Sequence, residues 1–158
     1  MVTTTVWWCH PLVDSFTAAV AATVANTAAA HGPTDMIDMY RDTQVPGGGD
    51  LLVCVHPTWW SAEPAAALQR YEALTGHPPR YRSLMTVSTH GSPRWVNMAE
   101  GRNARRNARR NIAPLIGAER SLWVAMYAMD RADADARAAH MRSASTRVNR
   151  ELTRLSQH

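Results

Sequence analysis

The chain has 158 residues, of which 46% are hydrophobic, and a formal net charge of +4. This length suits one domain, residues 1–158, with a sizeable core, and no apolar run approaches the ~20 residues of a membrane-spanning helix. No basic residue precedes the first apolar stretch, so we expect no secretory signal. We expect a cytoplasmic protein in which Cys9 and Cys54 are buried as reduced thiols.

Basic residues are concentrated in the second half of the chain. Residues 1–79 contain two arginines and seven acidic residues, whereas residues 80–158 contain fifteen arginines and six acidic residues. The chain has no lysine, which excludes a Schiff-base amine. The basic half indicates a phosphorylated or otherwise anionic ligand, with nucleic acid as a weaker alternative, and we predict no metal site.

The first strand and the first helix are predicted from residues 4–9 and 18–30. The strand is β-branched and aromatic and ends at His10, and Asp14 or Ser15 caps the alanine-rich helix. A strand that leads directly into a helix N-terminus can form an anion site, because free amide N–H groups and the helix dipole converge there. The simpler interpretation is an ordinary capped helix.

The central strand is predicted over residues 51–55, an unbroken apolar run typical of a strand buried on both faces. Before it, residues 35–40 alternate as an edge strand should. His56 and Pro57 are expected to end the central strand, and Ser61 to cap a helix over residues 62–74. Trp59 and Trp60 lie between strand and helix. They could hold a flat aromatic ligand or simply close the end of the core.

The remaining elements are a strand over residues 83–88, a helix over 97–116, a strand over 121–129 and a helix over 132–155 that begins at Asp130. A four-residue period places Arg102, Arg106 and Arg110 along one side of the 97–116 helix. That run of arginines could be a solvated face, or it could bind phosphate or the acidic surface of a partner. Nucleic acid is not expected, because interleaved aromatic residues are missing. We predict that His140 is a surface residue.

Alternation of strands and helices predicts an α/β protein with a parallel sheet covered on both faces. Five strands with a helix directly after the first predict a flavodoxin-like three-layer sandwich with strand order 2-1-3-4-5. In this order the strands that end at His10, Pro57 and Thr89 are neighbours, so we expect their three loops to meet at one site.

The three loops together resemble the flavin-binding loops of the flavodoxin-like NAD(P)H:quinone oxidoreductases, which include the modulator-of-drug-activity and potassium-efflux ancillary reductases. The similarity keeps the order of elements over nearly the whole chain. It rests on three segments: His-Pro-Leu-Val-Asp-Ser-Phe-Thr from residue 10, Pro-Thr-Trp-Trp-Ser-Ala-Glu-Pro from residue 57, and Thr-His-Gly-Ser-Pro-Arg-Trp from residue 89.

The resemblance implies a flavin-dependent oxidoreductase that passes a hydride from NAD(P)H to a quinone or similar flat acceptor. Because the family's covering segment is reduced to residues 41–49, FMN is the expected cofactor, with FAD as the alternative. A homodimer is expected to supply the missing wall. The alternative is a non-redox accessory subunit, or a biosynthetic enzyme that reuses the pocket.

The resemblance also implies roles for individual residues. Candidates for proton transfer are His90, Trp95 and His56, and Trp60 is a candidate for substrate binding. Apart from the resemblance, Arg94 follows the third loop directly and Arg102 lies on the predicted helix behind it, so their guanidinium groups are expected to bind a phosphorylated nicotinamide or another anionic substrate. The flavin-binding residues implied are His10, Ser15, Phe16, Thr17, Pro57, Thr58, Trp59, Trp60, Thr89, His90, Gly91 and Ser92.

Overall fold

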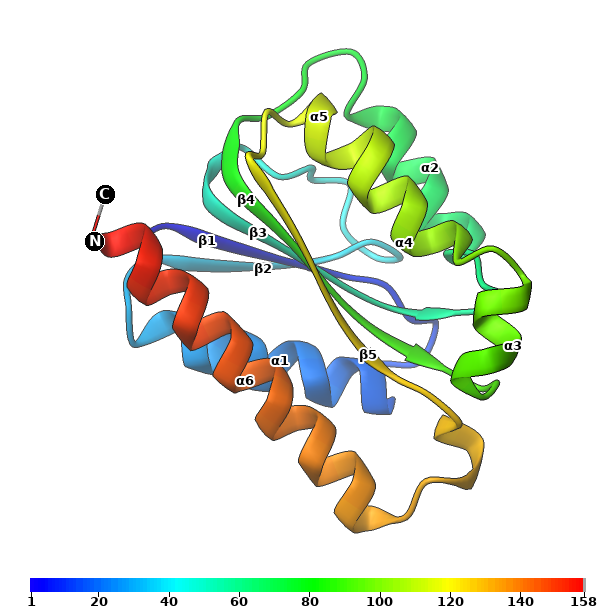
Figure 1. Cartoon of the computed structure of the whole chain (residues 1–158). Helices are drawn as coiled ribbons and strands as arrows, with labels where there is room; N and C mark the ends of the chain where they lie inside the picture. The colour runs from blue at the N-terminus through cyan, green and yellow to red at the C-terminus, as the bar shows by residue number, and fades with distance from the viewer. Residues whose placement is uncertain (158) are drawn as a thin grey trace.

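The computed structural model describes residues 1–157 and contains a five-stranded parallel sheet of order β2-β1-β3-β4-β5 (Figure 1). This confirms the predicted strand order. The short strands β1 and β2 run side by side from register pair Thr4–Thr34 to Trp8–Asp38. The strands are β1 (Thr4–Trp8), β2 (Thr34–Asp38), β3 (Gly49–Thr58), β4 (Tyr81–His90) and β5 (Arg120–Met126).

Helices cover both faces of the sheet (Figure 1). One face packs against α1 (Phe16–Ala29) and α6 (Ala134–Ser156), through a core of valines and leucines that includes Val6, Val53 and Leu152. The other face, with Trp7 and Leu52 at its centre, packs against α2 (Ala65–Ala73) and a broken helical segment. Within residues 1–157, none of the helices combines the length and the apolar character that crossing a membrane requires.

The two central strands extend further than the sequence predicts. We expected Pro57 to end β3, yet the strand continues to Thr58, opposite His90 of β4. The pairing of β1 with β3 ends at Trp8 and Val55. Pro57 therefore lies where β3 has a neighbour on one side only, so its missing N–H leaves the remaining ladder intact. Consequently both strands carry their last side chains to the edge of the sheet.

The helix predicted over residues 97–116 is wrong as a single element. Its place is taken by α3 (Arg94–Ala99), α4 (Asn103–Asn107), the π-helical turn η1 (Ala108–Ile112) and α5 (Ala113–Leu115). Gly101 and Arg102 both have positive φ, +87° and +52°, which ends α3 and redirects the chain. Pro114, which has no N–H to donate, lies two residues after the π-helical turn. The arginines therefore do not share one straight helix face.

Three further predictions are corrected by local packing. Ser61 does not cap α2, because the N-cap position is Pro64 and the Ser61 hydroxyl is engaged elsewhere. His140 is not a surface residue: it is only 6% exposed, on the face of α6 that packs toward Phe16. Asp133, rather than Asp130, caps α6 through a bond from the Ala136 amide, and Asp130 belongs to the short 3-10 turn η2 (Met129–Arg131).

The predicted burial of the two cysteines is confirmed. Cys9 and Cys54 are buried free thiols. Burial, first of all, raises the pKa of each to about 12. Neither thiol therefore ionises near neutral pH, and both act as small apolar side chains in the core beneath α2.

Candidate functional site

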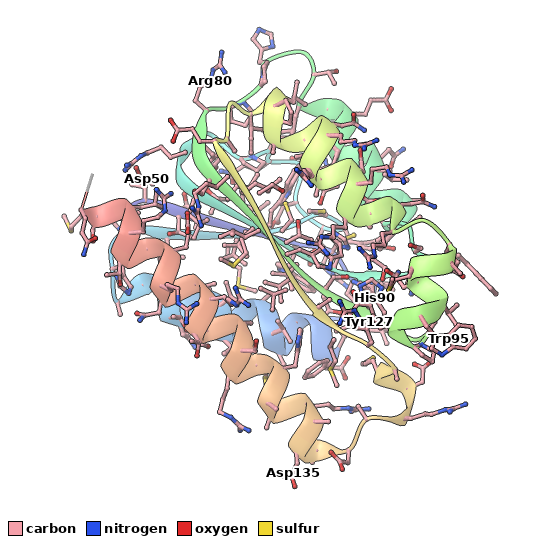
Figure 2. The ribbon with its side chains drawn as sticks, in the orientation of Figure 1. Asp50, Arg80, His90, Trp95, Tyr127 and Asp135 are labelled. Carbon is pink, nitrogen blue, oxygen red and sulfur yellow. The ribbon has the colours of Figure 1, made fainter. Side chains whose placement is uncertain are left out.

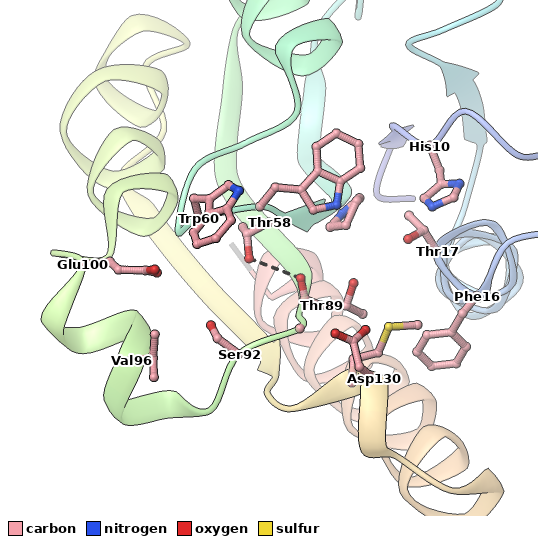
Figure 3. A pocket seen from close by; sticks show the side chains of 14 residues that line it. His10, Phe16, Thr17, Thr58, Trp60, Thr89, Ser92, Val96, Glu100 and Asp130 are labelled. Atoms are coloured by element: carbon pink, nitrogen blue, oxygen red, sulfur yellow. Dashed lines mark hydrogen bonds between the residues drawn. The ribbon is translucent and has the colours of Figure 1, made fainter.

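A cavity of about 570 Å³ lies at the carboxyl edge of the sheet, where the three predicted loops meet (Figure 3). The loop after β1, the loop after β3 and the loop after β4 all contribute to it, together with α3 and η2. The predicted residues that line the cavity are His10, Phe16, Thr17, Pro57, Thr58, Trp59, Trp60, Thr89, Gly91 and Ser92.

The N-terminus of α1 forms one wall of the cavity. The hydroxyl of Ser15 accepts a hydrogen bond from the Ala18 amide at 3.1 Å, so Ser15, one of the two predicted candidates, is the N-cap rather than Asp14. Phe16 and Thr17 begin the helix and line the cavity. Amides in a first turn have no acceptor within the helix, and the dipole places partial positive charge there. This wall can therefore bind an anion without any arginine.

His10 adds a further donor at this wall. Its Nδ1 accepts a hydrogen bond from the Leu12 amide at 3.1 Å, within the loop that joins β1 to α1. In the neutral ring the proton then resides on Nε2. Figure 3 shows the ring beside Thr17. His10 and Thr17 are thus the side-chain donors nearest to the start of α1 in this cavity.

The loop after β3 contains a tight turn that presents Trp60. The amide of Ala62 donates to the Trp59 carbonyl at 3.0 Å, and the Trp59 amide donates to the Ala62 carbonyl at 2.9 Å. The two central residues, Trp60 and Ser61, have φ of +52° and +65°, the signature of a type I′ turn. That turn normally requires Asn or Gly. Here a tryptophan adopts the strained backbone while its side chain is 87% exposed.

A buried hydrogen-bond network holds the turn in place. The side-chain amide of Asn97, on α3, donates to Ser61 Oγ at 3.0 Å and also lies 3.0 Å from His90 Nδ1. Thr58 Oγ1 lies 2.5 Å from the same nitrogen. The Asn103 amide, at the start of α4, donates to Ser61 Oγ at 3.2 Å. These bonds connect the ends of β3 and β4 to both short helices.

The network defines the protonation state of His90. With the side-chain nitrogen of Asn97 directed at it, Nδ1 acts as the acceptor, and this orientation of the amide assigns the ring proton to Nε2. Within residues 1–157, Nε2 has no hydrogen-bond partner. The ring is 2% exposed and stacks on Tyr127 at a centroid distance of 4.7 Å (Figure 2). Burial, together with the nearby His56 and His140, lowers the pKa of His90 to about 4.

The other residues predicted for catalysis lie outside the cavity lining. His56 is 1% exposed, its Nδ1 donates to the Pro57 carbonyl at 3.0 Å, and burial lowers its pKa. Trp95 is 71% exposed and points outward from α3 (Figure 2). Arg94 instead lines a smaller hollow of about 330 Å³ beside β5, and Arg102 precedes α4.

Four cavity residues were not anticipated from the sequence: Val96, Glu100, Met129 and Asp130. Val96 belongs to α3, Glu100 is the residue that caps its C-terminus, and the other two belong to η2. The carboxylate of Asp130 packs closely against Gly91, where an added Cβ would lie 2.7 Å from Asp130 Oδ2. Val96 and Glu100 follow the third loop closely in sequence, and Met129 and Asp130 follow the end of β5. These positions were the only sequence signals, because neither α3 nor η2 has a distinctive pattern.

The lining is suited to a planar ring with a phosphorylated tail. Amides at the start of α1, with His10 and Thr17, suit the phosphate, and the two tryptophan loop residues border the space for a ring. Asp130 and Glu100 are the two lining groups whose charge opposes an anion. Within the described residues 1–157, no three His, Cys, Asp or Glu side chains gather as a metal site would need.

Comparison with known proteins places the chain by its fold. No family profile matches it, and no curated protein matches it by sequence. Among solved structures, it is similar to an NAD(P)H:quinone oxidoreductase from Methanothermobacter marburgensis, with TM-score 0.77, 14% identity and coverage of 94% of both chains.

Two further solved structures belong to the same comparison. An FMN-dependent NADH-azoreductase from Bacillus anthracis, in complex with FMN, matches with TM-score 0.69, 13% identity and coverage of 98% of this chain and 99% of that chain. A flavodoxin, WrbA-like protein from Agrobacterium tumefaciens matches with TM-score 0.71, 11% identity and coverage of 100% and 99%. The chain therefore has the flavodoxin-like α/β fold.

Proposed function

We propose that the protein is a flavin-dependent NAD(P)H oxidoreductase that uses FMN and reduces a quinone or a similar flat acceptor. The observation that carries this proposal is the cavity itself: three strand-end loops meet around one space, with a helix N-terminus at one side and Trp59 and Trp60 at another. The solved structures of similar fold include enzymes described as a quinone oxidoreductase and an FMN-dependent azoreductase.

In this proposal the chain's own groups bind and orient the flavin. Amides of Phe16 and Thr17, with His10, hold the phosphate, while Pro57 to Trp60 and Thr89 to Ser92 border the ring and the ribityl chain. Bound flavin supplies hydride chemistry between a nicotinamide and the acceptor. Backbone dipoles at the strand ends stabilise charge that develops on the ring.

His90 acts as a positioning residue rather than as a proton donor in this arrangement. Its side chain is buried behind the cavity, where it receives hydrogen bonds from Asn97 and faces Thr58. A histidine with a pKa of about 4 is neutral at physiological pH, so it holds the loops without adding charge. The proposed roles of Arg94 and Arg102 toward an anionic substrate remain predictions, as does a cytoplasmic location.

A homodimer is part of the proposal. Large apolar side chains are exposed on the segments that follow the ends of β1, β3 and β4: Leu12, Val13, Trp59, Trp60, Trp95 and Met98. Exposed apolar groups of this size favour burial against another surface, and twofold pairing would cover the mouth. Light scattering tests this part. A mass near 17.5 kDa at micromolar concentration would contradict it.

The decisive experiment is a visible spectrum of the purified protein, before and after NADPH is added. The proposal expects flavin absorbance that bleaches with the reductant and returns with a quinone. Ser15→Glu should abolish flavin retention, because it places negative charge at the α1 N-terminus. A folded wild-type protein that binds no FMN would overturn the proposal and favour the non-redox alternative. Unchanged FMN binding in Ser15→Glu would contradict the placement of the phosphate at the start of α1.

A further inference from the structure

The cavity carries negative charge on the side of Trp60. Glu100 lines it at the end of α3, and Figure 3 shows its carboxyl group pointing into the space on that side. Its Oε2 is buried and has no hydrogen-bond partner within residues 1–157. None of the cavity-lining residues is an arginine, and none of the ion pairs formed by the described residues involves Glu100.

An unpaired carboxylate atom of this kind is costly unless a ligand supplies a donor or a positive charge. The geometry of α3 leaves few donors within the chain that could pair with the Glu100 carboxylate. The Glu100 backbone amide already donates to the Val96 carbonyl at 2.9 Å, and Arg102, the basic residue nearest in sequence, lies beyond the sharp turn at Gly101. The structure therefore keeps the basic side chain out of the cavity and the acidic one inside it.

Trp60 supplies the second half of a recognition site. Its indole ring is 87% exposed and is held at the cavity mouth by the strained turn that Asn97 and Asn103 brace through Ser61. The face of an indole ring attracts positive charge and stacks on flat rings. A planar ligand against Trp60 would have one edge toward Glu100. The indole face of Trp60 and the carboxylate of Glu100 then both favour a flat ring that carries positive charge.

We propose that the outer part of the cavity, between Trp60 and Glu100, binds planar aromatic cations in preference to neutral or anionic rings of the same shape. The claim that such cations are redox substrates rests on the proposed function. The preference for a positively charged ring does not, because it is measured by binding alone. This preference is separate from the predicted anionic-substrate roles of Arg94 and Arg102, because neither arginine lines this cavity. The chemistry covers both a cationic electron acceptor and the pyridinium ring of an oxidised nicotinamide.

The test is equilibrium binding by calorimetry to the oxidised, FMN-loaded protein, with no NAD(P)H present. Phenazine and N-methylphenazinium form a matched pair of rings that differ in charge, and nicotinamide and 1-methylnicotinamide form a second pair. We expect the phenazinium cation to bind about tenfold more tightly than phenazine. Glu100→Gln should remove most of that preference. Glu119→Gln, the same change at the opposite edge of the sheet, should retain it.

Each outcome separates the alternatives. A preference in both pairs assigns the site to planar cations in general, and a preference in the phenazine pair alone assigns it to the acceptor. Equal affinity for phenazine and its cation, or an unchanged preference in Glu100→Gln, overturns the inference. Flavin loading is read from the visible absorbance of the same samples. If FMN does not load, the titration is run on the flavin-free protein, so that the two proposals fail separately.

Discussion

Replacing His90 by asparagine should remove a measurable part of the protein's sensitivity to acid. Asparagine places its side-chain oxygen near the position of the histidine Nδ1, so it can still accept the hydrogen bond from Asn97, but it does not titrate. The wild-type ring is 2% exposed, and its pKa falls from 6.5 to about 4 because burial disfavours the charged form. Between pH 6.5 and about pH 4, the unfolded chain therefore binds a proton at His90 that the folded chain does not bind.

The sign and size follow from linkage. Stability supplied by the neutral ring is complete above pH 6.5 and is lost as the pH falls toward 4. At pH 5 the loss amounts to about 2 kcal/mol, since each pKa unit corresponds to about 1.4 kcal/mol. His90→Asn should be less stable than wild type at pH 8, because a smaller side chain fills the site. Its disadvantage should shrink by about 2 kcal/mol at pH 5.

Urea denaturation between pH 4.5 and pH 8 measures this difference. Burial also lowers the pKa of His56 and His140, but both are present in the two proteins and cancel. Parallel pH profiles for wild type and His90→Asn would refute the argument. An independent check is the NMR titration of the wild-type ring, whose carbon-bound protons should keep their neutral shifts until the pH approaches 4.

Three further variants probe the walls of the cavity. Asp130→Asn should tighten FMN binding about fivefold but leave riboflavin unchanged, because it removes a charge that opposes only the phosphate; calorimetry showing equal effects on both ligands would place Asp130 on the ribityl chain instead. Trp60→Gly should be about 1 kcal/mol more stable to urea than Trp60→Ala, because only glycine adopts φ of +52° without strain; the reverse order would deny the strain. Ser15→Ala should lower the free energy of unfolding by about 1 kcal/mol, as measured by denaturation, through loss of the bond to the Ala18 amide; an unchanged value would mean that the cap contributes nothing.

The sheet was predictable because its signals are local and repeated. A continuous apolar run marks β3, and the hydroxyl at Ser15 marks the start of α1, so strand order and the site's edge follow from topology rules. Ten of the residues predicted for flavin binding line the cavity for the same reason. Each lies within a few residues of a strand end, and neighbouring parallel strands bring those ends together.

The parts that sequence reasoning missed depend on contacts between distant segments. His140 looked polar and therefore exposed, but α6 turns it toward Phe16 of α1, where it is buried. Ser61 has the composition of a helix cap, yet its hydroxyl accepts hydrogen bonds from Asn97 and Asn103 instead. Local propensity cannot distinguish these uses of the same side chain, because the partners of Ser61 are 36 and 42 residues away and Phe16 is 124 residues from His140.

The break in the predicted 97–116 helix shows how this tertiary competition shapes the site. A straight helix would have carried its arginines along one side and would have left Ser61 with a single partner at most. Instead, positive φ at Gly101 and Arg102 turns the chain, so that Asn97 from α3 and Asn103 from α4 reach the same hydroxyl. The same turn leaves Glu100 in the cavity and Arg102 outside its lining. One backbone feature thus both braces the strained turn that presents Trp60 and determines the sign of the charge beside it.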